Sequence, residues 1–144
     1  GFADLVARRR AGRLRGLMFV HMKAGLDADP LRLRFSQESY TLRRTPLSPS
    51  GVRKDFQQAL AELRTDLNEF TTVESHGLMA CGYQMAKSSF AKEFQAQRAL
   101  WDAGPDEAWP FAEMLDEITS TAPTTPGRES LLAALRAGQK VAAF

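Results

Sequence analysis

The first candidates for a catalytic nucleophile and base are the residues at positions 75 and 76. Ser75 and His76 are adjacent, and a serine near a histidine is where a nucleophile and its general base would be sought. The surrounding pattern predicts a helix, in which neighbouring side chains point about 100° apart. Ser75 and His76 therefore cannot form a hydrogen-bonded catalytic pair with each other.

A metal site would have to draw on His21, His76 and Cys81. Their spacing is irregular and matches no common ligand pattern, so we expect neither a metal nor another cofactor. Cys81 falls in the middle of a predicted helix, on a face of small residues. We therefore expect a buried, apolar role for this thiol rather than a reactive one. A single cysteine also excludes an intrachain disulfide.

Positive charge is concentrated in the first part of the chain. Residues 1–54 contain 12 Lys and Arg against 4 Asp and Glu, a net charge of +8, whereas residues 55–144 contain 7 against 13, a net charge of −6. The densest cluster is Arg8, Arg9, Arg10, Arg13 and Arg15, followed further along by Arg43, Arg44, Arg53 and Lys54. We interpret this cluster first as a solvated face that pairs with the acidic half of the chain. The second interpretation is a binding surface for anionic lipid. No aromatic residues interleave with it, which argues against nucleic acid.

Two helices joined by a tight corner are predicted downstream of this basic region. Apolar residues before the corner recur at intervals of three and four: Val52, Phe56, Leu60, Leu63 and Leu67. Ser48 followed by Pro49 is predicted to cap this first helix. Thr71, with Glu74 three residues later, matches a capping box, so the second helix begins near Thr72.

The second helix carries small residues on one face, and they include two glycines. A glycine in mid-helix costs about 1 kcal/mol relative to alanine, so Gly77 and Gly82 are predicted to serve close packing. Arg64 and Asp66 at the corner are interpreted as an ion pair or as an anchor for the second helix. We expect no catalytic role for either.

The rest of the chain divides as follows. Residues 1–35 are predicted to hold a helix that stops at Gly12, a buried strand over 16–23 and a second extended stretch over 31–35. Residues 36–50 form a loop and residues 51–119 a helical segment, whose break near Ser88 is left open. Residues 120–127 form a linker, and 128–144 a last helix with Thr125 and Pro126 at its start.

Aromatic residues gather in the later helical segment: Phe90, Phe94, Trp101, Trp109 and Phe111, with Met114 beside them. Such a stripe is more often core than an acyl-chain groove, and we favour core. With 144 residues, 44% apolar and 25% charged, the chain has the composition of one soluble domain. No apolar run approaches the ~20 residues of a transmembrane helix. The predicted class is mainly α, with one or two N-terminal strands that belong to an α/β sheet.

A spaced pattern runs through the corner: Arg64-Thr65-Asp66-Leu67, Phe70, Glu74, Leu78-Met79, Gly82-Tyr83 and Met85. This pattern is similar to the C-terminal part of bacterial patatin-like phospholipases. Residues 15–26 also resemble a strand near the C-terminal side of that family's catalytic domain. The likeness covers residues 16–90, and we expect structural roles for the motif residues Arg64, Asp66, Phe70, Glu74, Gly77, Gly82 and Tyr83.

The resemblance implies a serine lipid acylhydrolase with a Ser-Asp dyad. Its signatures are Gly-x-Ser-x-Gly, Asp-Gly-Gly/Ala and a glycine-rich oxyanion loop, and none of the three occurs between Gly1 and Phe144. We therefore expect this chain to stabilise a catalytic domain whose dyad lies in an upstream segment or a partner chain. The expected location is the cytoplasm or the membrane periphery.

Two other functions stay open from the sequence. One is a non-enzymatic module whose basic N-terminal half docks on an anionic membrane or on a protein partner. The other is a structural subunit that completes a neighbour's sheet.

Overall fold

The computed structural model describes residues 1–14, 16–18, 20–26, 45–63, 69–100 and 108–139. The elements in these ranges are α1 (Phe2–Arg10), α3 (Lys54–Ala61), α4 (Thr72–Glu93), the 3-10 helix η1 (Gln95–Leu100), α5 (Ala112–Thr119) and α6 (Pro126–Ala137). Within them the chain pairs only as isolated bridges, Leu47 with Arg53 and Leu63 with Gln139. The predicted mainly α class is confirmed. None of the described helices is both long and apolar enough to cross a bilayer.

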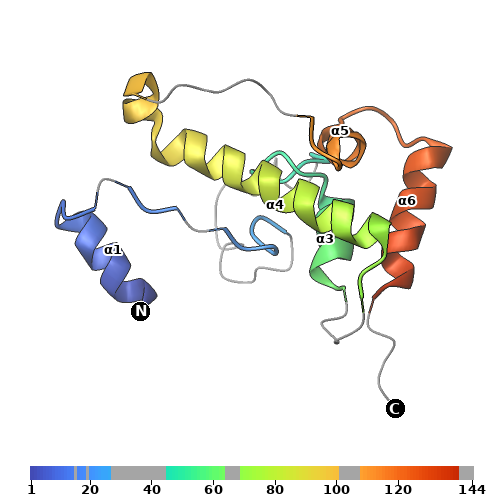
Figure 1. Ribbon diagram of the computed structural model, residues 1–144, viewed down its shortest axis with the longest axis horizontal. Helices are drawn as coiled ribbons and strands as arrows, with labels where there is room; N and C mark the ends of the chain where they lie inside the picture. The colour runs from blue at the N-terminus through green and yellow to red at the C-terminus, as the bar shows by residue number, and fades with distance from the viewer. Residues whose placement is uncertain (15, 19, 27–44, 64–68, 101–107, 140–144) are drawn as a thin grey trace, which may run out of the picture.

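Helix α4 is the longest described element, and α3, α5 and α6 are arranged around it (Figure 1). It contacts α3, α5 and α6, and α3 also contacts α6. α1 stands apart from this group, on the side where α4 ends (Figure 1). The body of the protein is therefore α3 to α6, to which α1 is joined by the segment that follows it.

The core lies between α3 and α4 and is closed by α5 and α6. Its buried apolar members are Val52, Phe56, Ala59, Leu60, Leu63, Ala80, Cys81, Met85, Phe111, Met114, Ile118, Leu132 and Leu135. The stripe predicted over residues 52–63 is therefore buried, as its spacing requires. Leu67, the last predicted member of that stripe, lies outside the described residues.

Two helices begin at their predicted caps. The hydroxyl of Thr71 accepts a hydrogen bond from the Glu74 amide at 3.2 Å, and the Glu74 carboxylate accepts one from the Thr71 amide at 2.7 Å. This is a complete capping box at the start of α4. The Thr125 hydroxyl accepts from the Arg128 amide at 3.2 Å at the start of α6, with Pro126 as first helical residue.

The two glycines of α4 differ, and only one of them serves packing. A Cβ on Gly77 would lie 2.9 Å from Leu60 Cδ2 and 3.4 Å from Leu135 Cδ2, so this glycine lets α3 and α6 approach α4 closely. A Cβ on Gly82 would meet nothing within 4 Å. The packing prediction is therefore confirmed at Gly77 and wrong at Gly82, where the helix faces open space.

Helix α3 begins later than predicted. The Ser48 amide donates to the Val52 carbonyl at 2.7 Å, and the Gly51 amide donates to the Ser48 carbonyl at 2.9 Å, so the backbone turns here. Gly51 has a φ of +82°, which no helix accommodates. The helix therefore starts at Lys54, after Arg53, without a side-chain cap. The predicted Ser48 cap is wrong because a turn intervenes.

Residues 16–26, here called the strap, do not form the predicted strand over 16–23. Their described part has no strand pairing and ends in a turn at Ala24 and Gly25. The Leu17 amide donates to Glu93 Oε1 in α4 at 3.0 Å. The Leu17 amide is therefore hydrogen-bonded to a side chain of the helical body and not to the backbone of a neighbouring strand. The stretch predicted to be extended over 31–35 lies outside the described residues.

The other helices follow the predicted order with shifted ends. α4 continues past Ser88 to Glu93, and its helical course passes into η1. The last helix of the segment predicted over 51–119 begins at Ala112, and the C-terminal helix ends at Ala137. Gly12, with a φ of +72°, lies just after α1, as predicted.

Candidate functional site

A cavity of about 550 Å³ opens between the start of α4, the whole of α5 and the start of α6. Its apolar lining comes from Val73, Met114 and Leu131, which are buried or half-buried. His76 and three carboxylate residues also line it: Glu113, Asp116 and Glu117. The cavity therefore combines apolar surface with negative charge.

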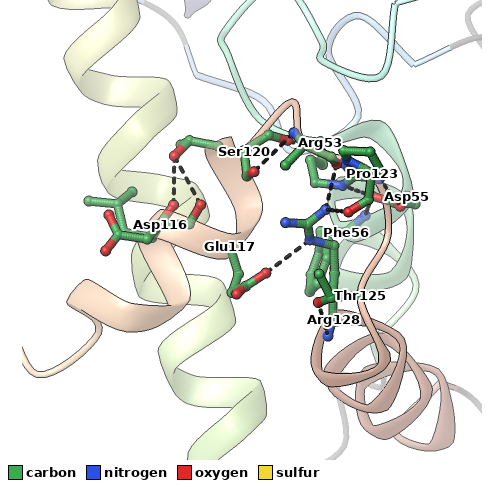
Figure 2. A network of polar contacts seen from close by, with 12 residues as sticks. Arg53, Asp55, Phe56, Asp116, Glu117, Ser120, Pro123, Thr125 and Arg128 are labelled. Carbon is green, nitrogen blue, oxygen red and sulfur yellow. Dashed lines mark hydrogen bonds and ion pairs between the residues drawn. The ribbon is translucent and has the colours of Figure 1, made fainter.

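The start of α6 is fixed beside this cavity by Arg128, which is only 3% exposed. Its Nε donates to Glu117 Oε2 at 2.9 Å, and its Nη1 donates to the carbonyls of Ala122 and Pro123 at 2.8 and 3.2 Å (Figure 2). A buried guanidinium needs such partners, because an unpaired buried charge is destabilising. Arg128 thus ties α6 to the end of α5.

A second buried arginine, Arg53, ties α3 to the same end of α5. Its Nε and Nη2 donate to both carboxylate oxygens of Asp55 at 3.1 and 2.9 Å, and its Nη1 donates to the Ser120 carbonyl at 3.2 Å (Figure 2). The Arg53 amide also donates to the Ile118 carbonyl at 2.7 Å. The sequence assigned Arg53 to the basic surface; at 7% exposure it is instead part of the packed interior.

The cavity can bind but lacks the parts for acyl transfer. Among the described residues of its lining there is no serine or cysteine, and Thr72 carries the one hydroxyl. The described residues contain no group of three or more His, Cys, Asp or Glu arranged to hold a metal ion. The carboxylates and His76 suit hydrogen bonding to a cationic or polar group, with the apolar lining beside it.

Cys81 is fully buried, as predicted. Burial raises the pKa of its thiol to about 12. Its Sγ lies 3.3 Å from Met22 Sδ and 3.7 Å from Met85 Sδ, so the thiol contacts sulfur rather than a base. Because the thiolate is the reactive form, this cysteine is inert in the folded state.

The predicted arginine cluster is divided by the structure. Arg8 pairs with Asp4 within α1 at 3.1 Å, and Arg9 pairs with Glu93 of α4 at 2.9 Å. Arg10 and Arg13 are exposed and have no carboxylate partner among the described residues. Arg15, Arg43 and Arg44 lie outside the described residues.

Glu93 is the point where α1, the strap and α4 meet. The Leu17 amide and the Arg9 guanidinium both donate to its Oε1. These two hydrogen bonds, that of Leu17 first, hold the pKa of Glu93 below its ordinary value. The attraction expected between the basic and acidic halves is realised at this pair.

The residues of the motif that resembles patatin-like phospholipases have different structural roles and lie in different places. Glu74 is 2% exposed and completes the cap of α4, and Gly77 contacts the core. The ring of Tyr83 is 5.9 Å from Phe111 and 6.2 Å from Trp109, whereas Phe70 is exposed. Arg64 and Asp66 lie outside the described residues. The described motif residues do not come together in one pocket.

The aromatic stripe is only partly core. Phe111 and Met114 are buried, and Trp109 stacks on Phe111 with ring centroids 5.7 Å apart. Phe90 and Trp109 remain more than a third exposed. Trp101 lies outside the described residues.

Sequence reasoning missed Gln57 and Arg128, which hold distant segments in place. Gln57 is fully buried, and its Nε2 donates to the carbonyls of Met22 and Ala24 in the strap. Gln57 follows Phe56 of the apolar stripe but is not a member of it, and no local spacing pattern predicted its burial. For Arg128, the signal was its place three residues after the cap Thr125.

Comparison with known proteins adds no relative: no family model, no curated protein and no solved structure matches this chain.

Proposed function

We propose that this chain is the C-terminal part of a patatin-like lipid acylhydrolase, in which it stabilises the catalytic domain without carrying the Ser-Asp dyad. The family assignment is supported by the resemblance between residues 64 and 85. Within that stretch, Glu74 caps α4 and Gly77 lets three helices meet. Structural positions of this kind are what a scaffold motif requires.

The strap is the observation that carries the proposed role. Glu93 and Gln57 hold its two ends against α4 and α3. Between these points Met18 and Val20 remain 38% and 37% exposed. A chain segment that is held in place and presents apolar side chains outward is suited to be covered by another layer of structure. That layer would be the catalytic α/β sheet.

The dyad would come from that other segment. This chain has no Gly-x-Ser-x-Gly and no Asp-Gly sequence, and the part of the cavity lining that the structure describes holds no serine. Acyl transfer needs an activated nucleophile together with preorganised oxyanion donors. The contribution of this chain would therefore be to position and stabilise, with α4 as the rigid element beneath the strap.

The test is reconstitution with a catalytic segment. The coding region immediately upstream of Gly1 is read for Gly-x-Ser-x-Gly and Asp-Gly motifs, and its product is co-expressed with this chain. We expect a stable complex in size-exclusion chromatography and hydrolysis of a phospholipid or p-nitrophenyl ester that depends on that segment's serine. Hydrolysis by this chain alone, or no complex between the two, would contradict the proposal.

A matched pair of variants sharpens this test. Met18→Lys places a charge on the exposed part of the strap, whereas Met79→Lys places one on an exposed position of α4. We expect Met18→Lys to weaken the complex at least tenfold, because a charge buried at an apolar interface is costly. Met79→Lys should leave it unchanged, and equal effects of the two would argue against the strap as the contact.

A further inference from the structure

The first fourteen residues form a basic and apolar surface that the helical body does not bury. α1 has no buried residue, and Phe2 and Leu5 are 55% and 41% exposed. After the helix, Gly12 turns the chain, and Arg13 follows. Here this surface, residues 1–14, is called the N-terminal basic segment.

Two of the four arginines of this segment are paired with carboxylates, so fewer charges are available to a binding partner. Arg8 is paired with Asp4, and Arg9 is paired with Glu93. Arg10 and Arg13 are exposed, and within the part of the chain that the structure describes they have no carboxylate partner, so their charges face solvent. The pairing of Arg9 with Glu93 also connects the segment to α4. The result is two outward cations beside two exposed apolar side chains.

We propose that the N-terminal basic segment docks on an anionic phospholipid surface. A surface helix with apolar side chains and flanking arginines inserts the former at the headgroup boundary and attracts anionic lipid with the latter. Charge complementarity selects this occupant, since the segment has four arginines against the single acidic residue Asp4. The proposal goes beyond the acylhydrolase function and does not need hydrolysis to be true.

The experiment is vesicle co-sedimentation of the full chain. Vesicles of phosphatidylcholine alone are compared with vesicles containing 30% phosphatidylserine, at about 0.05 and 0.5 M salt, where screening differs strongly. We expect binding to the anionic vesicles only, and loss of most binding at high salt. Equal binding to neutral vesicles, salt-insensitive binding or no binding would each overturn the proposal.

Charge variants locate the surface. One outward arginine near an anionic membrane strengthens binding about fivefold, so Arg10→Glu with Arg13→Glu should weaken binding at least about 25-fold. Lys87→Glu with Arg136→Glu makes the same change in net charge at exposed positions of α4 and α6. This control pair should reduce binding no more than about threefold, by its long-range charge alone. Equal losses would show a net-charge effect and overturn the proposal.

An apolar pair tests insertion. Leu5→Gln removes an exposed apolar side chain from α1, whereas Met79→Gln removes one from α4. We expect Leu5→Gln to weaken vesicle binding at least threefold and Met79→Gln to leave it unchanged, while circular dichroism shows both variants folded. Insensitivity to Leu5→Gln would contradict docking through this segment. Because vesicle binding is read without any hydrolysis, its failure leaves the proposed acylhydrolase role standing, and the reverse holds too.

Discussion

Gln57 of α3 donates its Nε2 proton to the carbonyl of Met22 at 2.6 Å, across 35 positions of the sequence. A second donation from the same nitrogen reaches the Ala24 carbonyl at 2.8 Å. Because Gln57 is fully buried, this amide is a fixed partner for the backbone of the strap. One side chain therefore does what a neighbouring strand would do in a sheet, and it keeps the strap against the body.

Replacing Gln57 should loosen the strap and destabilise the fold. Gln57→Met keeps the size of the side chain but leaves two carbonyls without their donor, at a cost of about 1 to 3 kcal/mol in the free energy of unfolding. Urea denaturation followed by circular dichroism measures it. Gln58→Met, one residue later on α3, changes a half-buried amide that bonds Glu62 at the surface, and it should cost less than about 0.5 kcal/mol. Similar losses for both would contradict a special role of Gln57.

The two glycines of α4 should respond to alanine with opposite signs. Gly82→Ala meets open space and should stabilise the protein by up to about 1 kcal/mol through helix propensity. Gly77→Ala puts a methyl group 2.9 Å from Leu60 Cδ2 in the core, and the overpacking should outweigh that gain by about 1 kcal/mol. Thermal unfolding of both variants decides the matter. Stabilisation by Gly77→Ala would mean that Leu60 moves aside easily.

Removing either partner of the Arg128–Glu117 ion pair should lower the free energy of unfolding, and removing Glu117 should lower it more. Glu117→Ala leaves the buried Arg128 guanidinium with only carbonyl partners and should cost about 3 kcal/mol. Arg128→Met leaves a carboxylate that is 37% exposed and can be hydrated, so about 2 kcal/mol is expected. Glu113→Ala on the same helix is the control, with about 0.5 kcal/mol or less. Chemical denaturation gives the order, and a smaller loss for Glu117→Ala than for Arg128→Met would be inconsistent with it.

These residues also show what the sequence could predict. The caps at Thr71 and Thr125 were predictable because their partners lie three residues away. The Ser48 cap failed because Gly51, with its positive φ, turns the chain before the helix can begin. The partners of Gln57 lie across the fold and leave no local pattern, so its hold on the strap could not be foreseen.

The strand predicted over residues 16–23 failed for a related reason. A short apolar run predicts a buried strand, but Met18 and Val20 are exposed, and the run does not say which partner provides the hydrogen bonds. Here Glu93 takes the Leu17 amide, and Gln57 takes the Met22 carbonyl. The cavity between α4, α5 and α6 was likewise unpredicted, because its lining joins three helices that no spacing rule connects.

The pKa of Glu93 should report the junction of α1 and the strap. It is lowered from 4.5 by the Leu17 amide first and by Arg9 second, so the junction contributes stability above pH 4.5, which is lost as pH falls through the lower folded value. Carbon-detected NMR titration of the Glu93 carboxyl group measures this pKa. Arg9→Gln should raise it only part of the way, since the Leu17 donor remains. Arg8→Gln, which breaks the pair with Asp4, should leave it where it was; a shift there would contradict the assignment.

Cys81 should resist thiol reagents until the protein unfolds. Burial raises its pKa to about 12, so thiolate is nearly absent at pH 8, and Met22 and Met85 cover the sulfur. We expect the reaction with a disulfide reagent to be at least about 100-fold slower than in urea. A control chain with Cys81→Ser and Met79→Cys carries its thiol at a position that is 54% exposed, and it should react at the rate of a free thiol. Rapid labelling of native Cys81 would mean that the strap opens readily and uncovers this part of α4.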